Sequence, residues 1–289
     1  MKNVLITGAN SYVGTSVEKW LLREPNSYHV ETLDMKDPNW VNYDFSKFDV
    51  VFHVAGIAHV SKKKSMENLY YKVNRDLAIE TALVAKENKV KQFIFMSSII
   101  VYNSKASKIS STLKPNPDNF YGKSKFQAEE GLLNLNNLDF KVTILRPPMI
   151  YGPNSKGNFS NLLKVSKKLF LLPEIHNRKS ILFIDNLSNF IEIVINKELS
   201  GIFHPRNYEI VSTNDIISTI RELNNQKNIY SKTFGFLIKF SSFFIPYFNK
   251  IYGDRYYDSD IDKITHNQKK LLNYNFITFK ESVGKSIVK

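Results

Sequence analysis

The stretch KNVLITGANSYVG, from Lys2 to Gly14, decides the fold. Its first six residues are a short apolar run that is typical of a buried parallel strand, and the run leads directly into Gly8. The residues after Gly14, up to about Arg23, have the spacing of an amphipathic helix. A glycine-rich turn between strand and helix lets the backbone approach a pyrophosphate, and the helix amino terminus offers free N–H groups. The stretch therefore predicts a dinucleotide site at the start of an α/β fold.

Strands and helices alternate along the chain beyond this turn. Further strands are expected at 29–33, 49–54, 92–96 and 141–145, and helices at about 67–88 and 121–135. This alternation is typical of βαβ units with right-handed crossovers. We therefore predict an α/β fold with a Rossmann-type, doubly wound parallel sheet and a smaller C-terminal substrate-binding lobe.

The pattern loosens after residue 150, which suggests how the chain is divided. We expect a dinucleotide-binding domain of residues 1–150 plus about 179–205. Residues 151–178 and 206–289 would then form the substrate-binding lobe, with its segments interleaved with the last elements of the sheet.

Composition excludes several functional classes. The 289 residues carry a net charge of +13, but the basic residues are scattered and form none of the motifs of a nucleic-acid binder. Without cysteine the chain has no disulfide or thiolate chemistry, and no metal-binding pattern is present. A strand at the amino terminus in place of a signal peptide indicates a cytoplasmic protein.

Residues at strand ends complete the expected dinucleotide site. Asp34 lies twenty residues past Gly14, where a carboxylate would accept hydrogen bonds from an adenosine ribose. That carboxylate should repel a 2′-phosphate, which favours NAD over NADP, although Lys36 would attract one. Ser11 replaces the middle glycine, and Asp44 and Phe45 are expected to flank the adenine. The residues expected at the cofactor up to this point are Gly8, Asn10, Ser11, Tyr12, Val13, Gly14, Asp34, Asp44, Phe45, Val54, Ala55 and Gly56.

Tyr121 and Lys125 form a candidate acid/base pair. They are four residues apart, so on a helix they lie on one face. An ammonium beside a phenol favours phenolate, and we expect it to lower the pKa of Tyr121. On spacing alone, a solvated helix face remains the alternative.

Six motifs occur in the order found in one family. They are TG at 7–8 with Gly14, HVAG at 53–56, VN at 73–74, SSIIVY at 97–102, YGKSK at 121–125 and RPPMIYG at 146–152. In this order the chain resembles the extended short-chain dehydrogenase/reductases, the nucleotide-sugar epimerase/dehydratase group. Three departures are Ser11, Asn103 after Val-Tyr, and Lys179 where the family has an arginine.

The resemblance implies a role for each matching residue. Tyr121 would be the acid/base, Lys125 would lower its pKa and hold the nicotinamide ribose, and Ser98 would hydrogen-bond the reacting sugar oxygen. Asn74, Ser97 and Pro147 would complete the cofactor site. The expected substrate contacts are Ser98, Ile99, Tyr121, Asn158, Arg178, Lys179 and Arg255. Which of Arg178 and Lys179 clamps a diphosphate stays open.

The finer resemblance points to bacterial polysaccharide-locus enzymes that reduce UDP-2-acetamido-2,6-dideoxy-4-keto-hexoses with NAD(P)H. It rests on residues 146–159, 177–180 and 201–205. A 4-epimerase shares every catalytic residue and is the alternative, and a non-catalytic cofactor-sensing protein is a remote one. A 4,6-dehydratase usually has Asp-Glu after the serine, whereas Ile99 and Ile100 follow Ser98 here, which argues against elimination.

Two expectations concern partners. Helices at about 67–88 and 121–135 pair in the family, which implies a homodimer. Residues 231–252 are rich in Phe, Ile and Tyr and are expected to form an amphipathic helix. That helix would either pack the smaller lobe or contact the inner face of a membrane peripherally.

Overall fold

A six-stranded parallel sheet forms the centre of the molecule in the computed structural model, which describes residues 1–57, 63–242, 244–261 and 277–287. The strands lie in the order β10-β6-β4-β3-β1-β2. Their bounds are β1 Lys2–Thr7, β2 Tyr28–Leu33, β3 Val50–His53, β4 Gln92–Met96, β6 Lys141–Leu145 and β10 Gly201–Phe203. The order reverses between β1 and β3, the place where ligands bind in doubly wound sheets. The Rossmann-type fold class is therefore confirmed.

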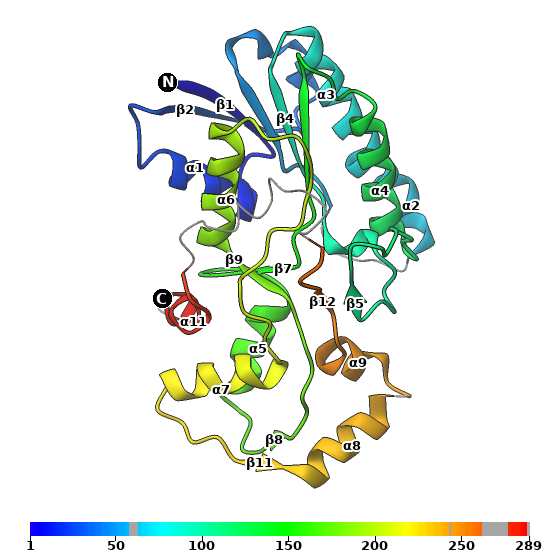
Figure 1. Ribbon diagram of the computed structural model, residues 1–289, viewed down its shortest axis with the longest axis vertical. Helices are drawn as coiled ribbons and strands as arrows, with labels where there is room; N and C mark the ends of the chain where they lie inside the picture. The colour runs from blue at the N-terminus through cyan, green and yellow to red at the C-terminus, as the bar shows by residue number, and fades with distance from the viewer. Residues whose placement is uncertain (58–62, 243, 262–276, 288–289) are drawn as a thin grey trace.

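Helices cover both faces of this sheet (Figure 1). Helices α1 (Tyr12–Leu21) and α6 (Ile184–Asn196) lie on one face, and α3 (Leu77–Glu87) and α4 (Phe120–Leu133) lie on the other. The strands divide their side chains between the two cores with period two: Val4 and Ile6 belong to one core, and Leu5 belongs to the other. Both faces are buried, which explains why the strands are apolar runs rather than alternating ones.

The smaller lobe is built from short elements below the sheet (Figure 1). Its strands pair as β7 (Met149–Tyr151) with β9 (Ile181–Phe183), β8 (Leu172–Pro173) with β11 (Tyr230–Ser231), and β12 (Tyr256–Tyr257) with β5 (Lys108–Ile109). Its helices are α5 (Asn158–Ser166), α7 (Thr213–Leu223), α8 (Lys232–Ser242), α9 (Pro246–Tyr252) and α11 (Phe279–Ile287). The exact division of the chain into domains stays a prediction.

The single helix expected over residues 231–252 is two helices. Helix α8 ends at Ser242, and α9 begins with Pro246 in its first turn. Proline lacks the N–H that a continuous helix would need and fits the first turn of a new one, so it restarts the helix. In the part of the chain that is described, no helix is long and apolar enough to cross a membrane.

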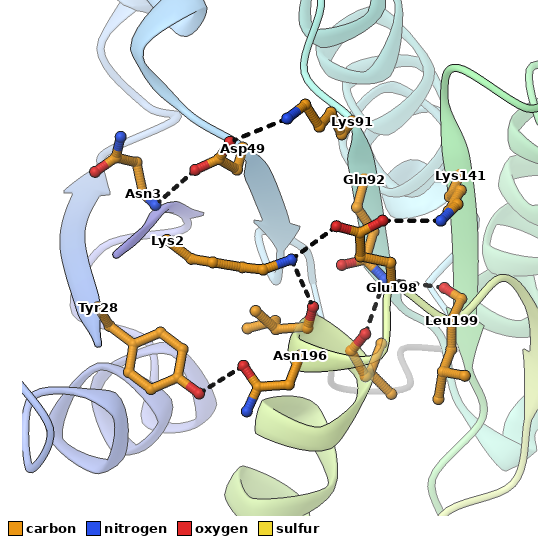
Figure 2. Close-up of polar contacts among 12 residues, drawn as sticks. Lys2, Asn3, Tyr28, Asp49, Lys91, Gln92, Lys141, Asn196, Glu198 and Leu199 are labelled. Atoms are coloured by element: carbon orange, nitrogen blue, oxygen red, sulfur yellow. Dashed lines mark hydrogen bonds and ion pairs between the residues drawn. The ribbon is translucent and has the colours of Figure 1, made fainter.

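Charged side chains pair across the amino-terminal edge of the sheet (Figure 2). Glu198 accepts hydrogen bonds from Lys2 Nζ and Lys141 Nζ, each at 2.9 Å, and so links β1 to β6. Asp49 accepts from the backbone N–H of Asn3 at 3.0 Å. These contacts hold the strands in register at the edge that lies away from the ligand side of the sheet.

Candidate active site

The turn between β1 and α1 depends on glycine at its first position. Gly8 has a φ of 109°, and a Cβ there would lie 2.7 Å from the backbone nitrogen of Ala55. Ser11 has a φ of −76° and caps α1, because its Oγ accepts a hydrogen bond from Gly14 N at 3.1 Å. Serine is tolerated at this position because the turn there needs no positive φ. The turn thus keeps the close backbone approach and the helix amino terminus that fit a pyrophosphate.

Other residues expected at the cofactor surround this turn. Asn10 is exposed and adopts a φ of 62°, and Val13 is partly buried in the first turn of α1. Tyr12 Oη is buried without a hydrogen-bond partner among the described residues and faces Gly152, where a Cβ would approach it to 2.7 Å. Burial raises the pKa of Tyr12, and the nearby Asp185 carboxylate raises it further.

Asp34 directly follows β2, on the same side as the glycine turn. The backbone nitrogens of Gly8 and Ala9 donate to Leu33 O at 2.9 and 3.1 Å, which ties the turn to the end of β2. Asp34 is exposed, and one carboxylate oxygen accepts a hydrogen bond from Lys36 N at 3.0 Å. The carboxylate is therefore accessible at the place where the sequence predicts a ribose contact.

The prediction that Phe45 flanks an adenine is wrong for its side chain. Phe45 is completely buried and packs with Trp40, Phe48 and Val51 in the core between the sheet and α3. Asp44 beside it is exposed and uses its carboxylate to cap the following turn, accepting from Ser46 N at 3.1 Å. The aromatic ring packs in the core, and the alternation of residue types in the sequence does not predict this burial.

The chain after β3 is held by a buried asparagine. Asn74 is fully buried, accepts from Ile57 N at 2.7 Å and donates to Ile57 O at 3.2 Å and to Ser124 Oγ at 3.2 Å. It lies in a π-helical segment, Tyr71–Asp76, between α2 (Glu67–Tyr70) and α3. Such π segments occur often at functional sites. Asn74 thereby fixes the backbone at Ile57, just after Gly56.

Small residues open the space above β3. Val54 is partly buried and Ala55 is buried, whereas Gly56 is exposed. A Cβ at Gly56 would lie 2.9 Å from Asn74 Oδ1 and 3.2 Å from Lys125 Nζ. Glycine therefore lets the strand end come close to the Lys125 ammonium, as the predicted passage of a dinucleotide requires.

Two residues after β4 have different environments. Ser98 is partly exposed, and its Oγ accepts a hydrogen bond from Ile100 N at 3.3 Å, which shapes the short 3-10 turn Ile99–Val101. Ile99 is buried in a small core with Tyr102, Ile109 and Tyr257. The Ile99 side chain is thus part of this core, and a contact of this residue with a substrate stays a prediction.

Helix α4 brings Tyr121 to Ser98. Asn119 caps the helix by accepting from Gly122 N at 2.9 Å, and a Cβ at Gly122 would lie 2.6 Å from Ile100 O. Glycine at 122 thus lets the helix pack directly on the turn after Ser98. Within this arrangement the Ser98 hydroxyl hydrogen-bonds with the Tyr121 phenol.

The electrostatic environment of Tyr121 and Lys125 differs from the one that their spacing in the sequence predicts. Burial raises the pKa of Tyr121 to about 12, against the lowering effect of the Ser98 hydrogen bond. Burial also lowers the pKa of Lys125 to about 7, with Glu129 opposing the shift. Lys125 Nζ donates to Met96 O at 2.8 Å and lies 4.4 Å above the Phe95 ring. The predicted fall of the Tyr121 pKa is therefore wrong for this structure, since burial outweighs any effect of the ammonium.

A buried ionic network below this pair was missed by the sequence analysis. Arg146, at the end of β6, donates to both carboxylate oxygens of Glu129, with Nη2 to Oε2 at 2.6 Å. Arg146 Nη1 also donates to Tyr102 Oη at 2.9 Å, and Tyr102 Oη lies 3.0 Å from His204 Nε2. A carboxylate one turn after Lys125 and an arginine ending an apolar strand were its only signals in the sequence.

This network also takes up one residue expected at the cofactor. Ser97 is buried, and its Oγ donates to Glu129. The hydroxyl of Ser97 is thus engaged within the protein, and a contact of this residue with a cofactor stays a prediction. Pro147 is buried at the end of β6, and its carbonyl accepts from Ile99 N at 2.9 Å. The network and this hydrogen bond join the ends of β4 and β6.

Basic residues gather where the sequence predicts a diphosphate contact. Lys179 Nζ donates to Lys250 O at 3.2 Å, and burial together with Arg255 lowers the pKa of Lys179 to about 8. Arg178 is exposed and its guanidinium lies 4.1 Å above the Tyr256 ring. Asn158 is exposed at the first position of α5. Arg178, Lys179 and Asn158 stay predicted substrate contacts.

Arg255 supports the turn after Ser98. Its guanidinium donates to the carbonyls of Ile99, Tyr102, Asn103 and Ser104, at 3.0 to 3.3 Å. These bonds tie the strand β12 to the turn after Ser98. Arg255 thereby holds the turn after Ser98, and its contact with a phosphate stays a prediction.

Comparison with known proteins places this geometry in a family. Residues 4–195 match the NAD dependent epimerase/dehydratase family. The chain is 30% identical over 243 residues to UDP-glucose 4-epimerase of Vibrio cholerae, covering 75% of this chain and 74% of that protein. It is 28% identical over 245 residues to N-acetyl-alpha-D-glucosaminyl-diphospho-ditrans,octacis-undecaprenol 4-epimerase of Escherichia coli O157:H7, covering 78% of this chain and 73% of that protein.

Solved structures share the fold at lower identity. UDP-glucuronic acid 4-epimerase from Bacillus cereus, in complex with NAD, superposes with a TM-score of 0.74 at 20% identity and covers 98% of this chain and 94% of its own. A dTDP-4-dehydrorhamnose reductase from Clostridium acetobutylicum superposes with a TM-score of 0.66 at 23% identity, over 79% of this chain and 83% of its own. With two thirds of the chain matched, this protein belongs to the NAD dependent epimerase/dehydratase family.

Proposed function

We propose that the protein reduces the C4 keto group of a UDP-2-acetamido-2,6-dideoxy-4-keto-hexose with NADH or NADPH, for surface polysaccharide synthesis. The proposal is supported by the meeting of Ser98, Tyr121 and Lys125 at the carboxyl ends of β3 and β4. This edge of the sheet also holds the glycine turn, so a dinucleotide bound there would reach the same three side chains.

The proposed division of labour follows from the geometry. A bound nicotinamide supplies the hydride for C4. Tyr121 holds the proton that the developing alkoxide needs, and the Ser98 hydroxyl, already hydrogen-bonded to that phenol, orients the same oxygen. Lys125 provides a positive charge held beside Gly56 by the carbonyl of Met96. Its ammonium would stabilise negative charge that appears on the phenol once the proton has left.

The protonated state of Tyr121 fits the reductive step, which a 4-epimerase also performs in its second half-reaction. The raised pKa of Tyr121, about 12, keeps the phenol protonated at neutral pH, which suits a proton donor. An oxidation would instead need the phenolate as a base. The absence of an acid and a base after Ser98, where Ile99 is buried, supports chemistry at C4 without elimination.

The cofactor side of the proposal favours NAD. The exposed Asp34 carboxylate follows β2 where a ribose would lie, and its charge disfavours a 2′-phosphate. Lys36 is also exposed and would act in the opposite direction. Measuring the dissociation constants of NADH and NADPH, with Asp34→Asn as the matched variant, decides the preference: the variant should lose selectivity against NADPH.

A 4-epimerase is the second candidate, and the two curated relatives favour it. The same Ser98, Tyr121 and Lys125 would first oxidise a C4 hydroxyl and then reduce the ketone on its other face. One relative is named for UDP-glucose and the other for a lipid diphosphate-linked N-acetylglucosamine, so both kinds of diphosphate carrier belong in the test.

One assay separates the two candidates. Purified protein is offered UDP-4-keto-6-deoxy-N-acetylglucosamine with NADH or NADPH, and separately UDP-N-acetylglucosamine, UDP-glucose and the lipid-linked sugar without added reductant. Stoichiometric consumption of reduced cofactor with the keto sugar supports the reductase. Interconversion of C4 epimers without net consumption, and no turnover of the keto sugar, would overturn it in favour of the epimerase.

The proposal extends to assembly and place. We propose a homodimer formed by the helices at 67–88 and 121–135, where Leu69 and Leu83 are exposed, acting in the cytoplasm. Light scattering of the purified protein tests this directly. A monomer over the whole accessible concentration range contradicts the dimer, and Leu83→Glu should shift a true dimer toward monomer.

A further inference from the structure

Exposed aromatic side chains form a row on helix α8 and just beyond its end, at the far end of the smaller lobe. Phe236, Phe240 and Phe244 follow one another at a spacing of four, with 68%, 56% and 74% of their surface exposed. Their ring centroids are 6.4 Å apart between Phe236 and Phe240, and 5.6 Å apart between Phe240 and Phe244. Leu237, 54% exposed, widens the row. These side chains form one continuous apolar surface outside the core.

The opposite face of α8 is fixed to the protein. Gly235 is buried against β8, where a Cβ would lie 2.7 Å from Glu174 O, and Ile238 is buried as well. Ser231 Oγ accepts from Phe234 N at 3.2 Å at the start of the helix. The helix therefore cannot rotate to bury its aromatic row without losing this close packing.

The apolar surface continues onto the neighbouring strands. Phe170 before β8 is 80% exposed, and Ile229 and Tyr230 at β11 are also exposed. Leu172 N donates to Ile229 O at 2.8 Å, which keeps these segments together. Figure 1 shows β8, β11 and α8 side by side at the bottom of the molecule. We define the aromatic patch as Phe170, Ile229, Tyr230, Phe236, Leu237, Phe240 and Phe244.

The chain segment that carries most of the aromatic patch has charges of one sign. Residues 223–253 contain no aspartate or glutamate, but they include four lysines, namely Lys227, Lys232, Lys239 and Lys250. Lys167 and Lys168 precede Phe170 in the chain. Exposed aromatic side chains on a segment whose only charges are lysines are complementary to an anionic lipid surface, because the rings enter the headgroup region while the ammonium groups meet the phosphates.

We propose that the aromatic patch docks this protein peripherally on an anionic lipid bilayer. None of the described helices is long and apolar enough to cross a membrane, so the proposed contact is with the membrane surface. The inner side of α8 lines a cavity of about 90 Å³ together with Asn177, Tyr252 and Asp254, next to Arg178. Docking therefore brings the predicted diphosphate residues of the smaller lobe close to the membrane, while the proposed reaction itself does not depend on it.

Vesicle binding of the full-length protein, without substrate, tests the proposal. We expect flotation with phosphatidylglycerol-containing vesicles, little flotation with pure phosphatidylcholine, and weakening at high salt. The double variant Phe236→Ser/Phe240→Ser should lower the partition coefficient by about tenfold or more. Leu138→Ser is the matched control, because Leu138 is 95% exposed and lies between α4 and β6. No binding of the wild type to anionic vesicles, or an equal loss in the control, would overturn the proposal.

A single-label experiment gives a second measurement that does not remove the aromatic residues. The chain has no cysteine, so Leu237→Cys and Leu138→Cys each provide one site for an environment-sensitive dye. Anionic vesicles should shift the emission of the dye to the blue at position 237 and leave it unchanged at position 138. If position 237 responds to protein concentration but not to vesicles, the patch joins two copies of the chain and the membrane proposal is wrong.

Discussion

The surroundings of Glu198 at one edge of the central sheet favour its charged form, whereas those of Lys125 and Tyr121 at the other edge disfavour theirs. At the amino-terminal edge, Lys2 and Lys141 lower the pKa of Glu198 to about 2, so the contacts favour the charged form. At the carboxyl-terminal edge, burial lowers the pKa of Lys125 to about 7 and raises that of Tyr121 to about 12. There the surroundings disfavour the charged form of each group.

This difference separates an edge built for stability from one suited to chemistry. Pairing partners stabilise charges, whereas desolvation without a full set of partners stores free energy in a site that a ligand can relieve. His53 adds to the contrast: it is fully buried beside the site, and burial together with the Lys125 charge lowers its pKa to about 3. It therefore stays neutral, and Thr7 Oγ1 lies 2.8 Å from its Nδ1.

Replacing one tyrosine by phenylalanine at each edge of the sheet should give the largest contrast in turnover. Tyr121→Phe removes the proposed proton donor, and we expect turnover to fall by roughly 10³-fold with cofactor affinity retained. Tyr28→Phe at the other edge removes a 2.8 Å hydrogen bond to Asn196 and should cost only about 1 kcal/mol of stability, with turnover unchanged. Steady-state kinetics and urea unfolding of both variants check this; an active Tyr121→Phe enzyme would refute the assignment.

Breaking the buried ion pair below the site should destabilise the fold more than breaking the exposed one. Glu129→Gln leaves the Arg146 guanidinium, only 5% exposed, without its charge partner, at an expected cost of about 3 kcal/mol. Glu198→Gln removes a carboxylate whose side chain is 39% exposed and should cost at most about 1 kcal/mol. Urea unfolding compares the two; equal losses would show that burial does not distinguish these pairs.

Removing Lys125 at the carboxyl-terminal edge and Lys141 at the amino-terminal edge should change the free energy of unfolding in opposite directions. Lys125→Met removes a desolvated ammonium, so at pH 7 the free energy of unfolding should not fall and should rise by about 1 kcal/mol. Lys141→Met breaks its pair with Glu198 and should lower it by about 0.5 kcal/mol. Because the folded pKa of Lys125 lies below its ordinary value, the penalty is present below pH 7 and is relieved as pH rises toward 10.5.

Activity completes this test of Lys125. We expect its methionine variant to lose about 10²-fold in turnover, since the proposed charge beside Tyr121 is gone. The Lys141→Met enzyme should turn over normally. A Lys125→Met protein that is both less stable and fully active would contradict the contrast between the edges.

The smallest expected effect is a loss of stability at low pH that comes from the amino-terminal edge of the sheet. The folded pKa of Glu198 is depressed from 4.5 to about 2, so its contribution is present above pH 4.5 and is lost as pH falls through 2. The carboxylate is partly exposed, so we expect Glu198 to account for at most about 1 kcal/mol of that loss. Urea unfolding of wild type and Glu198→Gln at pH 7, 4 and 3 checks this, because the difference between them should shrink as pH falls.

Local signals sufficed for the elements and for the meeting of the main residues. The run from Lys2 to Thr7, the turn at Gly8 and the caps at Ser11 and Asn119 act within a few residues of themselves, so their geometry follows from backbone sterics and hydrogen bonding. Parallel strands place their carboxyl ends at one edge, which brought Ser98 and Tyr121 together as the alternation of elements predicts.

Contacts between distant parts of the chain could not be predicted in this way. Arg255 Nη2 donates to Ile99 O across 156 positions, and through this contact Arg255 supports the turn after Ser98. No local signal predicts that the side chains of Phe45 and Ile99 are buried, because the packing of neighbouring elements decides it. The same holds for the ionic network of Glu129 and Arg146.

By itself the sequence determined the class of fold, the order of its elements and the residue types offered to the site, because periodicity, capping and glycine act locally. Only the tertiary structure decided which of those residues stay accessible and how each one titrates. Burial depends on segments that are far apart in the chain. It raises the pKa of Tyr121 and lowers that of Lys125, whereas their spacing predicts a lowered pKa for Tyr121.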